Sequence, residues 1–192
     1  MRKIVLTVLA VGVLGAAGIA AIWALPQEEP PALRLRAMLV EGGVDVTNKV
    51  EWFLERDDAW LGPDVDTVSV AVPGIYTAEF DILGGAPFTA EATLGEGQGG
   101  EVLAQLDAAL VEIKLDEDAR DGPVSLRFES DVSMGSTGLR VSQDGYVRAL
   151  VSRDLRKLEL ELPNQNIPVT GDFASGAVMP FELTDGAVTP IN

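Results

Sequence analysis

The sequence predicts a mainly β protein: one N-terminal transmembrane helix, then an antiparallel β-sandwich, then a second and smaller β unit. Two patterns indicate this fold class. An uncharged apolar run extends from Ile4 to Leu25. From Ala32 onward, apolar and polar residues alternate in short stretches that glycine, proline and aspartate interrupt. Alternation with a period of two is typical of strands that bury one face, and regularly spaced turn signals are typical of a sandwich.

Residues 1–25 are expected to form a membrane anchor whose N-terminus is cytoplasmic. At about 1.5 Å of rise per residue, the apolar run makes a helix roughly 33 Å long, and a hydrocarbon core is about 30 Å thick. Arg2 and Lys3 precede the run, and basic residues stay on the cytoplasmic side. Trp23 stands near the end of the run, where an aromatic ring anchors at the interface. We therefore expect a single-pass protein of a bacterial inner membrane, with the later residues in the periplasm.

A cleaved signal peptide is the alternative interpretation of this segment, with a mature N-terminus near Ala21. The small residues between Gly15 and Ala20 suit signal peptidase. The apolar run is longer than the roughly 7–15 residues of a usual signal-peptide core, which favours a retained anchor. The chain has no cysteine to acylate, so a lipoprotein is excluded.

One face of the expected helix carries a small residue at every fourth position, at Gly12, Ala16, Ala20 and Ala24. Such a face lets another helix approach closely in a membrane. The predicted partner is a transmembrane helix of a larger membrane-protein complex or a second copy of this helix, while residues 4–25 contact the lipid bilayer. The alternative is that small residues are simply common in membrane segments.

The charge and composition of the chain exclude several classes of function. It has 30 acidic and 14 basic residues, a formal net charge of −16, and neither histidine nor cysteine. An acidic surface repels nucleic acid, so no nucleic-acid partner is expected. Without histidine and cysteine, the usual ligands of zinc, haem and iron–sulfur sites are missing, and so are Ser-His-Asp and Cys-His catalysis within the chain. We expect no enzyme activity, no cofactor and no metal.

The first β unit is expected over residues 32–115, after a short proline-rich stalk at residues 26–31 that holds it close to the membrane. Its strands are predicted from alternating apolar residues separated by turn signals. The last of these strands is expected to bury Val111, Ile113 and Leu115.

Three segments of this unit are less regular. Glu101–Leu110 has some helical spacing, but the β-branched run that follows it favours a strand. Gly95–Gly100 is expected to be a hairpin loop, and Ala59–Asp66 a loop around Gly62 and Pro63. An exposed Trp60 in that loop would be a candidate partner contact, because tryptophan is enriched at interface hot spots. The alternative is that the loop folds over the edge of the sandwich.

Several motifs of this unit resemble those of prealbumin-like or Cna-B-type immunoglobulin-like modules of exported bacterial proteins. They are the strand Leu33–Val40 before Glu41-Gly42-Gly43, then Val50-Glu51-Trp52, Val72-Pro73-Gly74-Ile75-Tyr76-Thr77-Ala78 and Gly84-Gly85-Ala86. The resemblance covers Ala32 to Leu115. It implies an immunoglobulin-like β-sandwich with a structural or adhesive role and no chemistry of its own.

The second, smaller β unit is expected over residues 119–184. The charged segment Asp116–Pro123 predicts a boundary before it, and its acidic side chains lack the spacing of a calcium loop, which favours a solvated turn. Ser133–Gly138 is expected to be a flexible loop, and Asp144-Gly145 a hairpin turn. Residues 185–192 are expected to form a loose tail. No helix is expected after the anchor.

These observations favour a non-catalytic accessory or assembly subunit. Its small-residue helix face and its acidic periplasmic β domains would dock on a larger inner-membrane complex, for which a respiratory or photosynthetic complex is one suitable host. The alternative function is a soluble exported module, released by signal peptidase, that binds a glycan, a peptide or a cation. Intact mass of the native protein separates the two.

Overall fold

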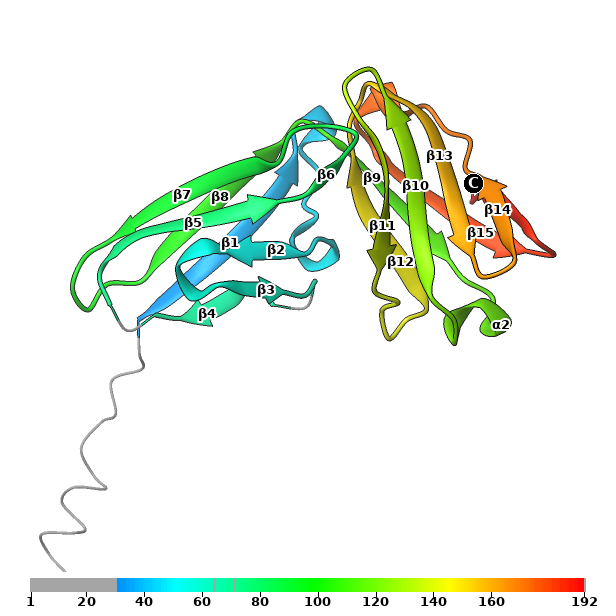
Figure 1. The fold of residues 1–192 in the computed structure, drawn as a ribbon. Coiled ribbons are helices and arrows are strands. Elements are labelled where there is room, and N and C mark those ends of the chain that lie inside the picture. The colour runs from blue at the N-terminus through cyan, green and yellow to red at the C-terminus, as the bar shows by residue number, and fades with distance from the viewer. Residues whose placement is uncertain (1–30, 64, 71, 192) are drawn as a thin grey trace, which may run out of the picture. The chain divides into compact units, whose positions relative to one another are not determined.

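Short strands make up most of the described chain, as the sequence predicts (Figure 1). The computed structural model describes residues 31–63, 65–70 and 72–191. Outside these residues lie the expected anchor, most of the stalk, and the candidate sites Gly12, Ala16, Ala20, Trp23 and Ala24. No helix within the described ranges is long and apolar enough to cross a membrane.

The strands follow one another along the chain with short connections. The first eight are β1 (Ala32–Leu39), β2 (Trp52–Leu54), β3 (Ala59–Leu61), β4 (Thr67–Ser69), β5 (Gly74–Phe80), β6 (Ile82–Leu83), β7 (Phe88–Leu94) and β8 (Gly100–Leu106). The next eight are β9 (Ala109–Lys114), β10 (Val124–Ser130), β11 (Met134–Leu139), β12 (Tyr146–Val151), β13 (Leu155–Leu162), β14 (Gln165–Pro168), β15 (Val178–Thr184) and β16 (Ala187–Pro190). The helical elements of the described part of the chain are the short helix α2 (Glu117–Arg120) and the 3-10 turns η1 (Glu41–Gly43), η2 (Thr47–Lys49), η3 (Glu55–Asp57) and η4 (Phe173–Ser175).

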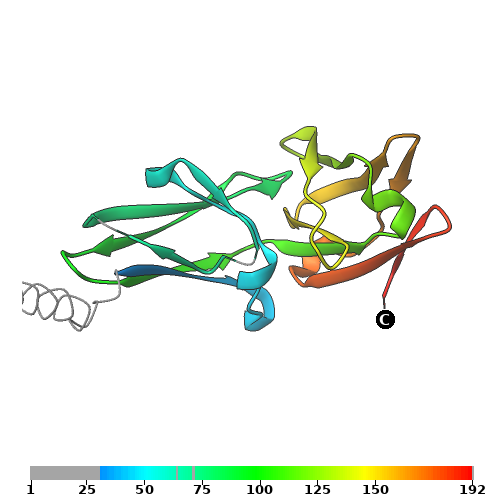
Figure 2. The same cartoon turned by 90° about the horizontal axis from the view of Figure 1, so that it is seen from below.

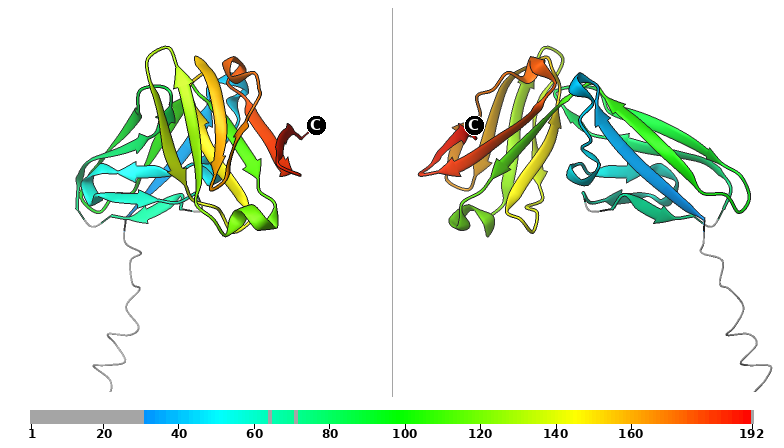
Figure 3. Two further views of the ribbon diagram at one scale, coloured as in Figure 1. Left: turned by 45° about the vertical axis from the view of Figure 1, so that its right-hand side comes forward. Right: turned by 180° about the vertical axis from the view of Figure 1, so that it is seen from behind.

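Within the described residues the strands form four sheets, of order β4-β1-β8, β3-β2-β5-β7, β11-β10-β13-β14 and β16-β15-β9-β12-β6. Figure 3 shows β10 beside β11 and β13, and Figure 2 shows β15 beside β16 at the C-terminal end. The pairs β1–β8, β6–β12 and β9–β15 are parallel, so the expectation of a purely antiparallel sandwich is wrong. These strands are far apart in sequence, so no tight turn forces them to run in opposite directions.

Two hydrophobic clusters fill the space between the sheets. Trp52, Phe80 and Leu106 are among the fully buried side chains of the first cluster. Phe181 and Leu158 belong to the second. The alternation expected for β1 is present, because every second residue from Leu33 onward is buried. Such burial is the main source of stability for a chain without disulfides.

Strand β9 takes part in both clusters. Leu110 packs in the first cluster, whereas Ala109 and Val111 pack in the second, because successive side chains of a strand point to opposite faces. Val111, Ile113 and Leu115 are buried, as expected, but among the residues of the second cluster. The neighbours of β9 in its sheet are β12 and β15. Residues 31–192 group as one compact unit. The division of this unit into separate β domains, residues 32–115 and 119–184, stays a prediction.

Three segments expected to be irregular are strands. Ala59–Leu61 pairs with β2, and Met134–Leu139 pairs with β10 despite its two glycines. Pairing with a neighbouring strand overrides a weak local β propensity. The expected loose tail, residues 185–192, contains β16, which pairs with β15. Asp185 and Gly186 connect these two strands, both with positive φ, as the favoured two-residue hairpin turn requires.

The boundary at Asp116–Pro123 contains a short helix, α2, where none was expected. The carboxylate of Asp116 accepts a hydrogen bond from the backbone N–H of Ala119 at 3.0 Å, the usual role of an aspartate before a helix. The preference for a strand over a helix at Glu101–Leu110 is confirmed by β8 and the start of β9.

Candidate functional site

An exposed tryptophan on an edge strand marks the candidate site. Trp60 is the central residue of β3 and is 54% exposed. Within the described sheets, β3 has a partner on one side only, β2. Trp60 stands opposite Phe53 of β2, with ring centroids 5.3 Å apart and planes tilted by 47°. Aromatic pairs of this geometry attract each other, so Phe53 supports one side of the Trp60 ring.

The alternation of β2 explains why one tryptophan is buried and the other exposed. Trp52 and Leu54 are fully buried, and Phe53 between them faces outward. The Trp52 indole nitrogen donates a hydrogen bond to the Val65 carbonyl oxygen at 2.9 Å, so its one polar atom is satisfied in the core. The outward face of β2 therefore carries the aromatic support for Trp60.

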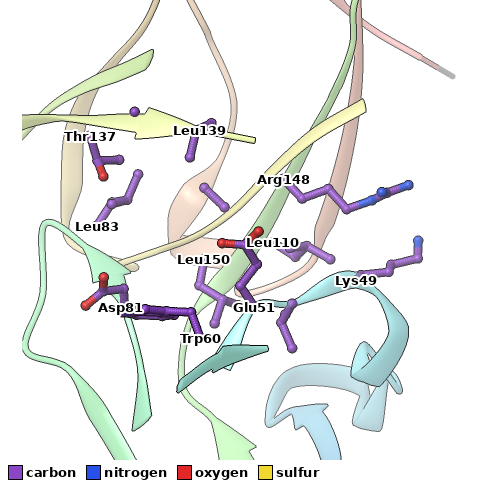
Figure 4. A pocket seen from close by; sticks show the side chains of 13 residues that line it. Lys49, Glu51, Trp60, Asp81, Leu83, Leu110, Thr137, Leu139, Arg148 and Leu150 are labelled. Carbon is purple, nitrogen blue, oxygen red and sulfur yellow. The ribbon is translucent and has the colours of Figure 1, made fainter. Parts of the chain in front are cut away.

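Trp60 borders a cavity of about 230 Å³, here called the Trp60 cavity (Figure 4). Its apolar wall consists of Val50, Leu83, Leu110, Leu139, Ala149 and Leu150, and its polar side chains are Lys49, Glu51, Asp81, Thr137 and Arg148, with Gly138 completing the lining. Cavities for drug-sized ligands are about 300–1,000 Å³. The Trp60 cavity is smaller, which suits one side chain or one ring of a larger ligand.

Two carboxylates of the cavity lie next to the ends of neighbouring strands, Glu51 just before β2 and Asp81 just after β5. Phe53 of β2 pairs with Glu79 of β5 in antiparallel register. Glu51 and Asp81, each two residues from that pair, therefore occupy the next row on the same face of the sheet. Both are exposed, and neither takes part in the ion pairs formed among the described residues.

The two cations of the cavity are held by other carboxylates. Glu112 of β9 is only 6% exposed, and its two carboxylate oxygens accept hydrogen bonds from Lys49 Nζ at 2.7 Å and Arg148 Nε at 2.8 Å. Arg148 Nη2 also donates to Asp144 Oδ2 at 2.6 Å. A buried carboxylate is tolerated when it is paired and hydrogen-bonded in this way. Lys49 and Arg148 are thus neutralised by partners of their own.

The hydrogen bonds of this network shift two pKa values. The hydrogen bond from Arg148 lowers the pKa of Asp144 to about 2, and a short hydrogen bond from Ser142 acts in the same direction against the effect of burial. Burial lowers the pKa of Arg148, but the hydrogen bonds to Asp144 and Glu112 outweigh it and raise that pKa. The guanidinium group also lies 4.9 Å from the Tyr146 ring centre, a distance typical of a cation–π contact.

The structure places the sequence-derived candidates as follows. Trp60 is exposed and borders a cavity, although it lies in a strand and not in the expected loop. The helix-face and interfacial residues of the expected anchor lie outside the described residues. Within the described ranges, no three histidine, cysteine, aspartate or glutamate side chains are grouped as a metal site requires.

Sequence reasoning missed Glu112, which the alternation of β9 would have pointed to solvent. The signal was present as one carboxylate in a run that is otherwise apolar from Ala108 to Ile113. A charged residue in such a position needs a partner if both faces of the strand are covered. Its partners Lys49 and Arg148 are 63 and 36 positions away, so their identity could not be read from local spacing.

Comparison with protein-family models gives no match, and comparison with curated proteins gives none. Among solved structures, a candidate cell adhesion protein from Bacteroides ovatus is 12% identical, with a TM-score of 0.32, covering 86% of this chain and 97% of that one. The TIE protein of Bacillus anthracis is 12% identical, with a TM-score of 0.29, covering 81% of this chain and 34% of that one. A candidate polysaccharide-binding protein from Bacteroides thetaiotaomicron is 9% identical, with a TM-score of 0.28, covering 84% and 98%.

The described chain is β-sandwich-like, as the sequence predicts, with paired sheets enclosing apolar clusters. Its assignment to immunoglobulin-like, prealbumin-like or Cna-B-type modules stays a prediction.

Proposed function

We propose that this chain is a non-catalytic, membrane-anchored accessory protein whose β part docks on a partner protein through Trp60. The observation that carries the proposal is the placement of Trp60: a large aromatic ring, half exposed, supported by Phe53 and bordering a cavity. Tryptophan at the edge of a pocket is the kind of residue that dominates the binding energy of protein interfaces. Residues 4–25 would hold the β part near the membrane surface.

The chemistry of the cavity supports binding over catalysis. Among the described residues that line the cavity, Thr137 carries the one hydroxyl group, and the chain has no histidine or cysteine to act as base or nucleophile. The strongest polar cluster nearby, centred on Glu112, is satisfied by Lys49 and Arg148. A polar network whose members are paired in this way stabilises a fold.

Purification of the tagged full-length chain from its native membranes in mild detergent tests this proposal. We expect an intact mass that includes residues 1–25 and a stoichiometric membrane-protein companion. Trp60→Ala should release that companion. Leu103→Ala is the matched control, because Leu103 is also exposed, 49%, but lies on β8 away from the cavity. Migration of the wild-type protein alone would contradict the proposal.

The same measurement tests the second candidate, a soluble exported module. A native mass that lacks the first twenty or so residues, without any companion, would favour that candidate. The specific observation in its favour is that the Trp60 cavity has room for one ring or side chain, and it would then be the binding site for a soluble ligand.

A further inference from the structure

The residues that line the Trp60 cavity favour one kind of ligand group. We propose that it receives the guanidinium group of an arginine side chain presented by the partner protein. This inference rests on the proposed function, because it identifies the group that docks at Trp60. Four features of the cavity lead to it: the aromatic ring, the unpaired carboxylates, the neutralised cations and the size.

The aromatic ring favours a flat cation. Trp60 is supported by Phe53 on one side and borders the cavity. Tryptophan is the best aromatic partner for a cation, and a planar guanidinium stacks on its face as well as being attracted by its charge distribution. Neutral apolar groups would gain from the ring but not from the carboxylates beside it.

The carboxylates supply the matching charge. Glu51 and Asp81 line the cavity and belong to no ion pair among the described residues. Carboxylate oxygens accept paired hydrogen bonds from the fork of guanidinium N–H groups. Figure 4 shows Glu51 and Asp81 with Trp60 among the side chains that line the cavity.

The cations of the lining do not oppose this binding strongly, because each is already paired. Lys49 binds Glu112, and Arg148 binds both Glu112 and Asp144. In Figure 4 the ends of Lys49 and Arg148 point away from Trp60. Arg140 lies with Glu51 at a smaller adjoining cavity and is the one nearby cation without an ion pair in the described residues.

The charge of the whole chain also favours a basic ligand group. A formal net charge of −16 attracts a basic partner surface and repels an acidic one. The cavity volume of about 230 Å³ admits one side chain and not a folded element. The occupant is therefore one basic side chain projecting from a partner whose surface is basic.

Nuclear magnetic resonance of the three tryptophan indole N–H groups of the full-length chain, in neutral detergent micelles, tests the inference. Trp60→Phe identifies the Trp60 signal by its loss. The probes are the peptide amides Gly-Arg-Gly and Gly-citrulline-Gly, which differ by one charge at nearly constant shape, and N-acetylglucosamine. We expect Gly-Arg-Gly to shift the Trp60 signal with a dissociation constant of about 1 mM, a value suited to one side chain. The dissociation constant of the citrulline peptide should be at least about tenfold higher.

Matched variants then separate charge from folding. Glu51→Gln with Asp81→Asn should weaken Gly-Arg-Gly binding about tenfold, and Arg140→Gln should strengthen it. The Trp52 indole signal, held by its hydrogen bond to Val65, reports on the fold and should stay in place in both variants. Raised salt should weaken binding in the wild type more than in the double variant.

Three results would overturn the inference: equal shifts from arginine and citrulline, no shift from either, or a Trp60 response to N-acetylglucosamine alone, which would make the cavity a saccharide site. These failures are distinguishable from failure of the proposed function. Suppose that Trp60→Ala releases the native companion but the carboxylate variants bind the companion as tightly as the wild type. The proposed docking at Trp60 would then hold, and the inference that an arginine side chain fills the cavity would be wrong.

Discussion

The ammonium nitrogen of Lys49 lies 2.7 Å from a carboxylate oxygen of Glu112, although the two residues are 63 positions apart. The other oxygen of Glu112 accepts from Arg148 Nε at 2.8 Å. One carboxylate thereby links the turn η2 to the strands β9 and β12. Because Glu112 is only 6% exposed, this network is far less screened by solvent than the surface ion pairs of the chain.

Glu112→Ala should therefore destabilise the fold by about 2 kcal/mol, because it removes the carboxylate partner of Lys49 and leaves the largely buried Arg148 paired with Asp144 alone. Urea unfolding measures the change. Glu182→Ala is the matched control: Glu182 pairs with Lys114 at 3.2 Å with both side chains 44% exposed, and such a pair contributes about 1 kcal/mol or less. Equal losses in the two variants would show that burial gives Glu112 no special weight.

Truncation of the two tryptophans should destabilise the fold to very different extents. Trp52→Ala removes a fully buried ring and its hydrogen bond to Val65, and should cost about 3–5 kcal/mol. Trp60→Ala removes an exposed ring and one contact with Phe53, and should cost about 1 kcal/mol or less. Thermal unfolding of both variants measures this difference. A large loss for Trp60→Ala would indicate that the ring holds the edge of the fold together and would weaken its assignment as a docking residue.

The pH dependence of stability should carry a contribution from Asp144. Its pKa is lowered from 3.8 to about 2 in the folded chain, first of all by the hydrogen bond from Arg148. A carboxyl group with a lowered folded pKa stabilises the fold fully above its unfolded value and loses that effect as the pH falls toward the folded value. The loss should therefore develop from about pH 4 toward pH 2.

Asp144→Asn should flatten that part of the profile. Asp144 is largely exposed, with 53% of its side chain accessible, so solvent screening limits the contribution to about 1 kcal/mol or less. Urea unfolding at pH 6 and at pH 2.5 gives the comparison, because most of the loss lies between the unfolded and the folded pKa. Identical pH dependence in the wild type and in Asp144→Asn would show that the ion pair with Arg148 adds nothing to stability.

The C-terminal hairpin depends on one glycine conformation. Gly186 has a φ of 74°, and a Cβ added there would meet nothing closer than 3.5 Å, so Gly186→Ala tests backbone strain alone. An alanine in the left-handed region costs about 1–2 kcal/mol. Gly138→Ala is the control, because a Cβ at Gly138 meets nothing within 4 Å and its φ is not positive.

Hydrogen exchange at Thr189 of β16 reports the result, because hydrogen-bonded pairs alternate along an antiparallel ladder and Ile191 N–H, two residues further on, donates to the Pro180 carbonyl oxygen. We expect Gly186→Ala to lower its protection and Gly138→Ala to leave it unchanged. Unchanged protection in both variants would mean that the pairing of β15 with β16 does not rely on this turn.

Local pattern was enough to predict most strands of the chain. The alternation of Leu33, Leu35, Ala37 and Leu39 predicted β1 and its buried face, because side chains alternate across a strand whatever the strand pairs with. The Asp185-Gly186 turn was also readable as a hairpin signal, although the tail was expected to be loose. Met134–Leu139 was not readable, since its glycines favour a loop until β10 supplies a pairing partner.

The candidate site, like the fold, was only partly predictable from local sequence pattern. The sequence alone determined that the chain is strand-rich and acidic, lacks histidine and cysteine, and carries Trp60 as a candidate contact. Only the tertiary structure decided that Trp60 stands opposite Phe53 beside a cavity, that Glu51 and Asp81 share its lining, and that Glu112 is buried against Lys49 and Arg148. The physical reason is that strand pairing joins residues distant in sequence, so neither the partner of a buried charge nor the wall of a cavity has a local signature.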